Sequence, residues 1–394
     1  MNVLVLNAGS SSVKFQVIDT QKEVALISGL AEGIGLETSK FTYKVDGQKY
    51  PREVSISNHD DAVSLVVELI KEKIGLDQIK AVGHRVVHGG EYYSDSVVID
   101  DEVIDRIEEL FNLAPLHNPP NLAGIKACMS AIPNVPQVAV FDTAFHQSIP
   151  EENYLYSIPY EFYEKYKIRK YGFHGTSHRY VTGKALGFEP NVEKIITCHL
   201  GNGSSLCAVC DRKSMNTTMG FTPLQGLMMG TRAGDIDTTT VEFLMEKEDM
   251  SIGDVIKLLN KSSGLRGICG DSDMRTIHEK RLKGSRMHQL AFDMFCHRIK
   301  TFIGSYFAEL NGCDMIVFTG GIGEKDEFVR ESVCKGLGNL GVDIDYKKNM
   351  GIKETAELST EDSKVKVYVI ETNEELMIAK DTAKLIKGDV LLSE

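Results

Sequence analysis

The chain has 394 residues, of which 42% are hydrophobic and 25% are charged, and its formal net charge is −12 at pH 7. This composition is typical of a globular protein, and the length predicts two or three domains. The negative charge argues against nucleic acid as the main partner, because phosphate backbones are bound by positive fields. No apolar run reaches the roughly 18 residues of a membrane span, so we expect no membrane partner.

The sequence favours a cytoplasmic protein. It begins directly with an apolar run rather than with a secretory signal, and its eight cysteines are scattered along the chain. We therefore expect reduced thiols. Cys207 and Cys210 form one C-x-x-C pair within an expected strand, where positions three apart face opposite sides, so we interpret them as structural residues.

The pattern along the chain predicts strands that alternate with helices, which indicates an α/β fold. In the first half we expect a β-hairpin at 1–20, helices at 60–74 and 100–113, and strands at 79–87 and 137–141. The second half is expected to begin near residue 150. There we expect strands at 195–200, 206–209, 214–219, 315–318 and 365–370, and helices at 238–247, 251–260, 285–310, from 326, and 373–386.

One phosphate-loop pattern occurs twice, at a constant offset of 194 residues. Leu6-Asn7-Ala8-Gly9-Ser10-Ser11-Ser12 near the start corresponds to Leu200-Gly201-Asn202-Gly203-Ser204-Ser205-Leu206 in the middle, and each loop joins two apolar runs. Glycine lets the backbone approach a ligand, successive N–H groups attract anions, and serine hydroxyls add donors. Ser12 and Lys14 share one face of the following strand. Although such turns also occur in ordinary hairpins, the repeat predicts duplicated halves that grip one phosphorylated ligand in a cleft.

A third glycine-rich turn, Gly320-Gly321-Ile322-Gly323, follows a buried strand and is suited to a phosphate or ribose. The sequence contains neither G-x-x-x-x-G-K-[ST] nor G-x-G-x-x-G after a first strand, which argues against a P-loop enzyme and a dinucleotide fold.

Several cationic or acidic side chains stand beside turn residues. Arg85 ends a strand, Asp142 follows one, and Arg232 lies among small residues. His117 is expected in a rigid Pro115–Pro120 loop. His84/His88 and His174/His178 are spaced four apart, which permits a metal pair, but the sequence around Gly175 is expected to be a loop and no carboxylate motif completes a site.

Together, these segments resemble the acetate kinase family along essentially the whole chain. The matching segments are Asn7–Phe15, His84–Gly90, Phe173–His178, His199–Gly203, Thr222–Arg232, Gly320–Glu324 and Asn373–Glu375. The resemblance implies duplicated actin/sugar-kinase-like (ribonuclease H-like) domains, each a mixed sheet flanked by helices, with an inter-domain cleft. The expected domains are residues 1–148 plus 376–394, which would bind acetate and phosphate, and residues 149–375, which would bind nucleotide.

The resemblance also implies the reaction. ATP and acetate would give ADP and acetyl phosphate reversibly, with Mg²⁺ (or Mn²⁺ in its place) near Asn7 and Glu374. Arg85 would bind the acetate carboxylate, Asp142 would be the active-site carboxylate, and His174 and Arg232 would stabilise the transferring phosphoryl group. The acetate pocket would be lined by Val87, Leu116, His117, Phe173 and Pro223.

The nucleotide would be held by residues from all three glycine-rich loops. The expected contacts are Ser10, Ser12, Lys14, His199, Leu200, Gly201, Asn202, Gly203, Asp273, Met274, Arg275, Gly320, Gly321, Ile322, Gly323 and Glu324. Met274 stands where family members commonly carry an aromatic residue.

Two alternatives remain open. A propionate or butyrate kinase of the same family differs only by methylene groups in the acid, each worth about 1–3 kcal/mol in an apolar pocket. A chaperone-like ATPase would use nucleotide to drive motion without a carboxylate acceptor. A homodimer is expected, from base rates and from the family resemblance.

Overall fold

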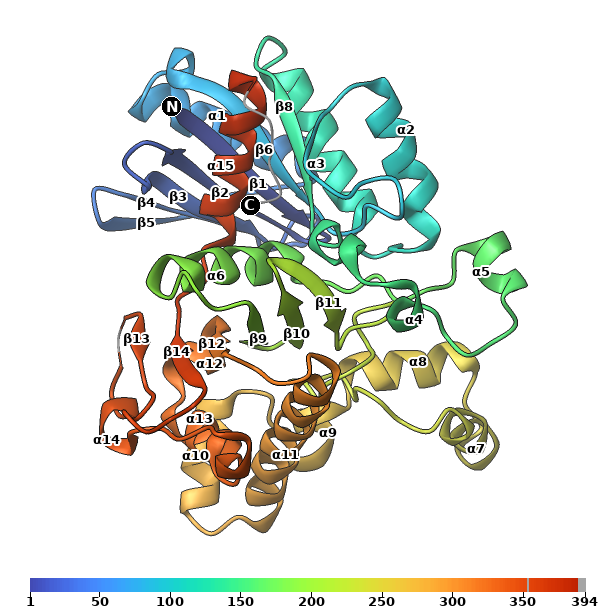
Figure 1. Cartoon of the computed structure of the whole chain (residues 1–394). Coiled ribbons are helices and arrows are strands. Elements are labelled where there is room, and N and C mark those ends of the chain that lie inside the picture. Colours follow the sequence, from blue (N-terminus) through green and yellow to red (C-terminus); the bar gives the residue numbers. More distant parts are fainter. Residues whose placement is uncertain (353, 389–394) are drawn as a thin grey trace. The chain divides into compact units, whose positions relative to one another are not determined.

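The computed structural model describes residues 1–352 and 354–388. The described residues divide into two compact units, 1–147 with 373–388 and 148–352 with 354–372. The predicted domains were bounded at 148/149 and 375/376, so Asn373, Glu374 and Glu375 fall in the first unit rather than the second. In both units a mixed sheet is accompanied by helices (Figure 1).

The first unit is built on an eight-stranded sheet in the order β5-β4-β3-β2-β1-β6-β8-β7. Its strands are β1 (Asn2–Gly9), β2 (Ser12–Asp19), β3 (Val24–Glu32), β4 (Lys40–Val45), β5 (Gln48–Glu53), β6 (Ile79–Val86), β7 (Val97–Val98) and β8 (Gln137–Phe141). Its α-helices are α1 (His59–Lys73), α2 (Asp101–Glu109), α3 (Asn118–Ala131) and α15 (Glu374–Lys387).

The second unit is built on a six-stranded sheet in the order β11-β10-β9-β12-β14-β13. Its strands are β9 (Lys194–Leu200), β10 (Ser204–Cys210), β11 (Lys213–Thr217), β12 (Met315–Thr319), β13 (Ala356–Glu357) and β14 (Lys366–Val369). Its α-helices are α4 (Glu151–Tyr154), α5 (Glu161–Tyr166), α6 (Gly175–Phe188), α7 (Thr239–Glu248), α8 (Ile252–Lys261), α9 (Gly264–Cys269), α10 (Met274–Leu282), α11 (Arg286–Glu309), α12 (Gly320–Lys325), α13 (Glu327–Cys334) and α14 (Tyr346–Asn349).

The two sheets repeat one topology. In the first, β1 pairs antiparallel with β2 and parallel with β6, and β8 pairs parallel with β6 and antiparallel with β7. In the second, β9, β10, β12, β14 and β13 make the same pairings in the same directions. Each repeated glycine–serine loop is the turn of its first hairpin, so the internal repeat expected from the sequence is present in the fold.

Three local predictions were wrong. Gly175–His178 is not a loop but the first turn of α6, and Pro115–Pro120 is not a rigid loop throughout, because His117 caps α3 and Pro119 and Pro120 lie in its first turn. Proline fits there because the first N–H groups of a helix have no partner within it. The Gly320–Gly323 turn is already helical in α12, directly after β12. The following elements were not predicted: strands β3, β4, β5, β7 and β13, and helices α3, α4, α5, α6, α9, α10, α12 and α14.

Helix α15 packs directly on the first sheet, where Figure 1 shows it crossing the strands of this unit. Gly83 in β6 makes this close approach possible: a Cβ atom there would lie 2.4 Å from Thr382 Oγ1 and 2.7 Å from Ile378 Cγ2 of α15. The close packing places the N-terminus of α15, with Glu374, beside the end of β6. In the part of the chain that the structure describes, no helix combines the length and apolarity needed to cross a bilayer.

We expect Gly83→Ala to destabilise the protein by about 1–3 kcal/mol, because the methyl group would overpack the contact with α15. The urea midpoint of unfolding measures the change. The matched control is Gly183→Ala in α6, where an added Cβ meets nothing within 4 Å; alanine there should stabilise by up to about 1 kcal/mol. Equal midpoints for the two variants would contradict the packing argument.

Candidate active site

Polar side chains form a row across four adjacent strands of the first sheet. Lys14 of β2 lies opposite Asn7 of β1, and the register of β1 and β6 places Asn7 beside Arg85. Asp142 follows β8 directly and lies on the face of the sheet that carries Arg85. Because β1, β6 and β8 are parallel, the row lies at their carboxyl ends, which is where α/β sheets bind ligands.

Arg85 and Asp142 form the central ion pair of this row. Arg85 Nε donates to both carboxylate oxygens, at 3.1 and 3.0 Å, and Nη2 donates to Oδ2. The Asp142 side chain is 2% exposed, whereas that of Arg85 is 22% exposed. Burial alone would lower the pKa of Arg85, but Asp142 and Glu374 raise it above its ordinary value. The guanidinium is therefore a fixed cation, and Nη1 is only loosely engaged, 3.5 Å from Asn7 Oδ1.

The N-terminus of α15 adds two carboxylates to the row. Glu375 forms an ion pair with Lys14, and Glu374 Oε2 lies 3.9 Å from Arg85 Nε. Burial and, to a smaller extent, the neighbouring carboxylates of Asp142 and Glu375 raise the pKa of Glu374 to about 7, although Arg85 and Lys14 act in the opposite direction. The charged form of Glu374 is thus poorly compensated, which an added cation would correct.

The residues near Arg85 fit a magnesium ion. Asn7 offers an amide oxygen, and Glu374 and Asp142 offer carboxylates, which are the hard oxygen donors that Mg²⁺ prefers. Among the described residues, no group of three His, Cys, Asp or Glu side chains is arranged to hold a metal. Mg²⁺ usually takes only one or two protein carboxylates and completes its shell with water and substrate phosphates.

The loop after Arg85 is held by two buried asparagines of α3. Asn121 accepts a hydrogen bond from Val87 N and donates to Ala8 O, while Asn118 accepts from His88 N and donates to His88 O. Val87 is buried there. Of the other predicted pocket residues, Leu116 is 68% exposed and His117 caps α3 in the first unit, whereas Phe173 is buried and Pro223 is half-buried in the second. A shared acetate pocket remains a prediction.

In the second unit, His174 is held in an uncommon backbone conformation. It caps α6 with φ 58° and ψ 19°, the left-handed region that non-glycine residues rarely adopt and that is enriched at functional sites. Its ring lies 4.3 Å, between centroids, from the ring of His199 in β9. Nδ1 of His174 is hydrogen-bonded to Ser205 Oγ at 2.9 Å.

His174 and Arg232 meet at the repeated loop. A Cβ atom on Gly203 would lie 3.4 Å from both Arg232 Nη1 and His174 Nε2. Arg232 is half-buried, and burial lowers its pKa. Its side chain donates to Pro223 O at 3.4 Å, and within the described residues no carboxylate lies within 4 Å of it. Its positive charge is therefore not neutralised, unlike that of Arg85.

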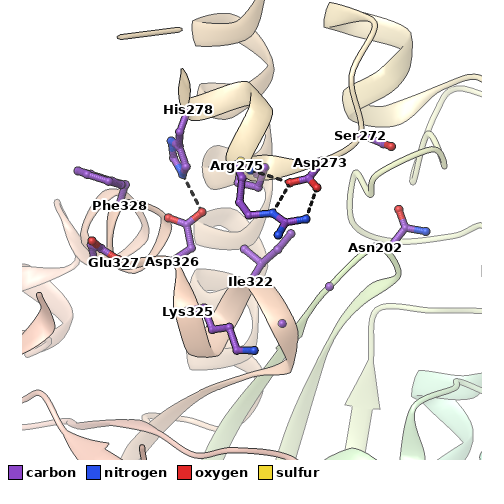
Figure 2. A pocket seen from close by; sticks show the side chains of 13 residues that line it. Asn202, Ser272, Asp273, Arg275, His278, Ile322, Lys325, Asp326, Glu327 and Phe328 are labelled. Atoms are coloured by element: carbon purple, nitrogen blue, oxygen red, sulfur yellow. Dashed lines mark hydrogen bonds and ion pairs between the residues drawn. The ribbon is translucent and has the colours of Figure 1, made fainter. Parts of the chain in front are cut away.

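A cavity of about 550 Å³ opens beside the same loop in the second unit (Figure 2). Seven of its lining residues were predicted to bind nucleotide: Gly201, Asn202, Asp273, Met274, Arg275, Gly321 and Ile322. Asp273 caps α10 and holds Arg275 through two hydrogen bonds, at 3.0 and 2.6 Å. Met274 is buried and packs in the hydrophobic core.

Six further lining residues were missed by the sequence analysis: Ser272, His278, Lys325, Asp326, Glu327 and Phe328. His278 Nε2 is hydrogen-bonded to Asp326 Oδ2 at 2.7 Å, and its ring lies 5.1 Å from that of Phe328. Phe328, 37% exposed, supplies an aromatic face that Met274 lacks. The sequence did predict a helix from Asp326, and the start of that helix supplies three of these lining residues, Asp326, Glu327 and Phe328.

Other predicted nucleotide residues lie elsewhere. Glu324 accepts hydrogen bonds from Gly320 N at 2.9 Å and Thr372 N at 3.0 Å, which ties α12 to the strand end after β14. Gly320, with φ 76°, allows α12 to start against β9, because a Cβ there would lie 2.8 Å from Leu200 O. In the first unit, Ser10 is exposed, Ser12 is half-buried and Lys14 is paired with Glu375.

Comparisons with known proteins give a consistent result. Residues 2–380 match the model of the Acetokinase family. The acetate kinase of Thermosipho africanus is 54% identical over 99% of each chain, and that of Carboxydothermus hydrogenoformans is 53% identical over 98% of this chain and 99% of its own.

Solved structures agree. The crystal structure of Porphyromonas gingivalis acetate kinase has a TM-score of 0.94 at 42% identity and covers 98% of this chain and 99% of its own. A propionate kinase from Francisella tularensis has a TM-score of 0.93 at 43% identity, covering 97% and 99%. The match over nearly the whole length, in sequence and in fold, shows that this chain belongs to the acetokinase family.

Proposed function

We propose that the protein is an acetate kinase, which transfers the γ-phosphoryl group of ATP to acetate and gives acetyl phosphate and ADP reversibly. Family membership supports the reaction. The observation that carries it is the half-buried guanidinium of Arg232, which has no ion-pair partner among the described residues and borders Gly203 together with His174. An uncompensated cation at a glycine-rich loop is suited to a transferring phosphoryl group.

The chemistry requires positioning rather than a strong base. Acetate is already ionised at neutral pH, so one of its oxygens attacks the γ-phosphorus directly while the bond from phosphorus to the ADP oxygen breaks. The charge spreads over three equatorial oxygens, where cations stabilise it. Arg232 and a donor nitrogen of His174 would stabilise the negative charge on these oxygens.

Arg85 would bind the acetate carboxylate through its less engaged Nη1 and the remaining proton on Nη2, because Asp142 occupies its Nε side. Guanidinium binds carboxylates in a fork geometry and stays charged. Asp142 would then hold Arg85 in place rather than abstract a proton. The cavity beside Met274 and Phe328 would take the adenosine.

We propose Mg²⁺ as the cofactor, held by Asn7 and Glu374. Both side chains offer oxygen donors, and the carboxylate of Glu374 is poorly compensated by the cations around it. When bound, the ion would neutralise phosphate oxygens. Domain closure over the substrates, a homodimer, a cytoplasmic location and acceptance of Mn²⁺ remain part of the proposal.

The direct test traps acyl phosphate with hydroxylamine after incubation of the protein with Mg-ATP and acetate, propionate or butyrate. Propionate is the informative comparison, since one similar structure is a propionate kinase. We expect the highest kcat/KM with acetate. A higher value with a longer acid would change the substrate, and ATP hydrolysis without acyl phosphate would support a chaperone-like ATPase instead.

We expect Arg232→Ala to reduce kcat by about 10³-fold or more, the range found for arginines that stabilise phosphoryl transfer. Its thermal midpoint should change little, because no buried carboxylate loses its partner. Arg212→Ala, in the exposed turn between β10 and β11 of the same unit, is the control. An Arg232→Ala enzyme within a few-fold of wild-type kcat would refute the role.

We expect Arg85→Ala to raise the KM for acetate more than tenfold while the KM for ATP stays within about threefold, since an arginine–carboxylate interaction is worth about 1.5–3 kcal/mol. The variant should also unfold more easily, because the buried Asp142 carboxylate loses its ion pair with Arg85. In the double variant Arg85→Ala/Asp142→Asn, stability should recover but acetate binding should not. Equal increases in both KM values would contradict a carboxylate-specific role.

A further inference from the structure

Four side chains of the second unit form one hydrogen-bonded chain that ends at His174. Thr197 Oγ1 lies 2.7 Å from His178 Nδ1, His178 Nε2 lies 2.8 Å from Ser205 Oγ, and Ser205 Oγ lies 2.9 Å from His174 Nδ1. Thr197, His178 and Ser205 are fully buried, and His174 is half-buried.

The local fold brings the four together. His174 and His178 are four residues apart at the start of α6, so they share one face of the helix. In the pairing of β9 and β10, Thr197 is opposite Cys207, two positions from Ser205, so Thr197 and Ser205 lie on the same face of the sheet. Both strands turn this face toward α6, because His178 contacts each of them.

The direction of the chain follows from counting protons. Thr197 has one hydroxyl proton, no exposure to water, and, in the described part of the chain, the His178 ring nitrogen as its one side-chain hydrogen-bond partner. A buried hydroxyl proton without an acceptor is costly, so Thr197 donates to His178 Nδ1. His178 then carries its proton on Nε2 and donates it to Ser205 Oγ. Ser205 Oγ accepts this hydrogen bond and donates its own hydroxyl proton to His174 Nδ1.

We propose that Thr197, His178 and Ser205 are positioning residues that fix neutral His174 as the Nε2–H tautomer. The proton then sits on the ring nitrogen that borders Gly203 beside Arg232, where a donor is needed for the phosphoryl oxygens. If the hydrogen bonds ran in the opposite direction, His174 Nε2 would carry a lone pair instead of a proton and would repel the phosphoryl oxygens. This inference deepens the proposed function and depends on it for the role of His174, but not for the tautomer itself.

The first experiment measures the tautomer in the wild-type protein, without substrates. Long-range ¹H–¹⁵N correlation spectra of protein labelled with ¹⁵N-histidine, recorded at pH 8, distinguish protonated from unprotonated ring nitrogens; His174→Gln assigns the signals. We expect the proton on Nε2 in both His174 and His178. A proton on Nδ1 of His174 would overturn the proposal.

The second experiment measures kinetics in variants. In Ser205→Ala we expect kcat to fall about fivefold, the effect of one net hydrogen bond, with both KM values within about twofold. In Thr197→Val, the fraction of His174 that carries its proton on Nε2 should fall. Thr197→Ser keeps the hydroxyl group and should therefore keep the wild-type tautomer and kcat. Unchanged kcat in Ser205→Ala, or an unchanged tautomer in Thr197→Val, would overturn the positioning role.

Thr217→Val is the matched control. Thr217 is also fully buried in this sheet and donates to Leu206 O at 2.8 Å, outside the chain of four. It should lose stability but keep the tautomer of His174 and kcat. A protein that makes no acyl phosphate but shows the expected tautomer would refute only the proposed function; an active enzyme with the other tautomer would refute only this inference.

Discussion

The reaction we propose joins two anions, acetate and ATP, on a protein whose own net charge is −12. Coulomb repulsion must therefore be overcome by cations at fixed places, and the two central arginines do so differently. Arg85 is held by Asp142 and keeps only part of its hydrogen-bonding capacity for a ligand. Arg232 has no carboxylate partner among the described residues and keeps its full charge. The first arrangement favours orientation of a small carboxylate, and the second favours stabilisation of charge that develops during transfer.

The repeated topology gives both units the same means of presenting polar groups. In each, a hairpin with a glycine–serine turn pairs with parallel strands, and a helix contacts the sheet face that carries the polar residues. In the first unit α15 brings carboxylates to that face, whereas in the second α6 brings histidines. The same framework thus supports different chemistry because the side chains on its covering helices differ.

Most of the long strands and helices, and the repeated loops, could be predicted from the sequence, because hairpin turns and apolar runs are local signals. Some missed elements lacked such signals, whereas others carried a signal that was not used. Every residue of β5 is exposed, so no apolar alternation marks it. The Asp46-Gly47 turn that joins β5 to β4 is nevertheless a local hairpin signal. Helix α6 begins with Gly175, Thr176 and Ser177, all weak helix formers, and it is stabilised by burial instead.

The sequence predicted only one side of the cavity that we propose to bind nucleotide. The glycine-rich and Asp273–Arg275 segments matched known motifs, whereas His278 and Asp326 meet across 48 residues of sequence, a pairing that a single sequence does not reveal. Glu324 was expected to contact nucleotide; its carboxylate accepts hydrogen bonds from two backbone N–H groups, and a contact with nucleotide stays a prediction.

We propose that Arg85 holds the acceptor while Arg232 and His174 hold the transferring group. A crystal structure with Mg-ADP, acetate and a planar phosphoryl mimic such as aluminium fluoride would reveal both sets of contacts. We expect acetate on Arg85, with the mimic in line between acetate and ADP and contacted by Arg232 and His174 Nε2. Acetate bound away from Arg85, or a mimic without contact to Arg232, would contradict it.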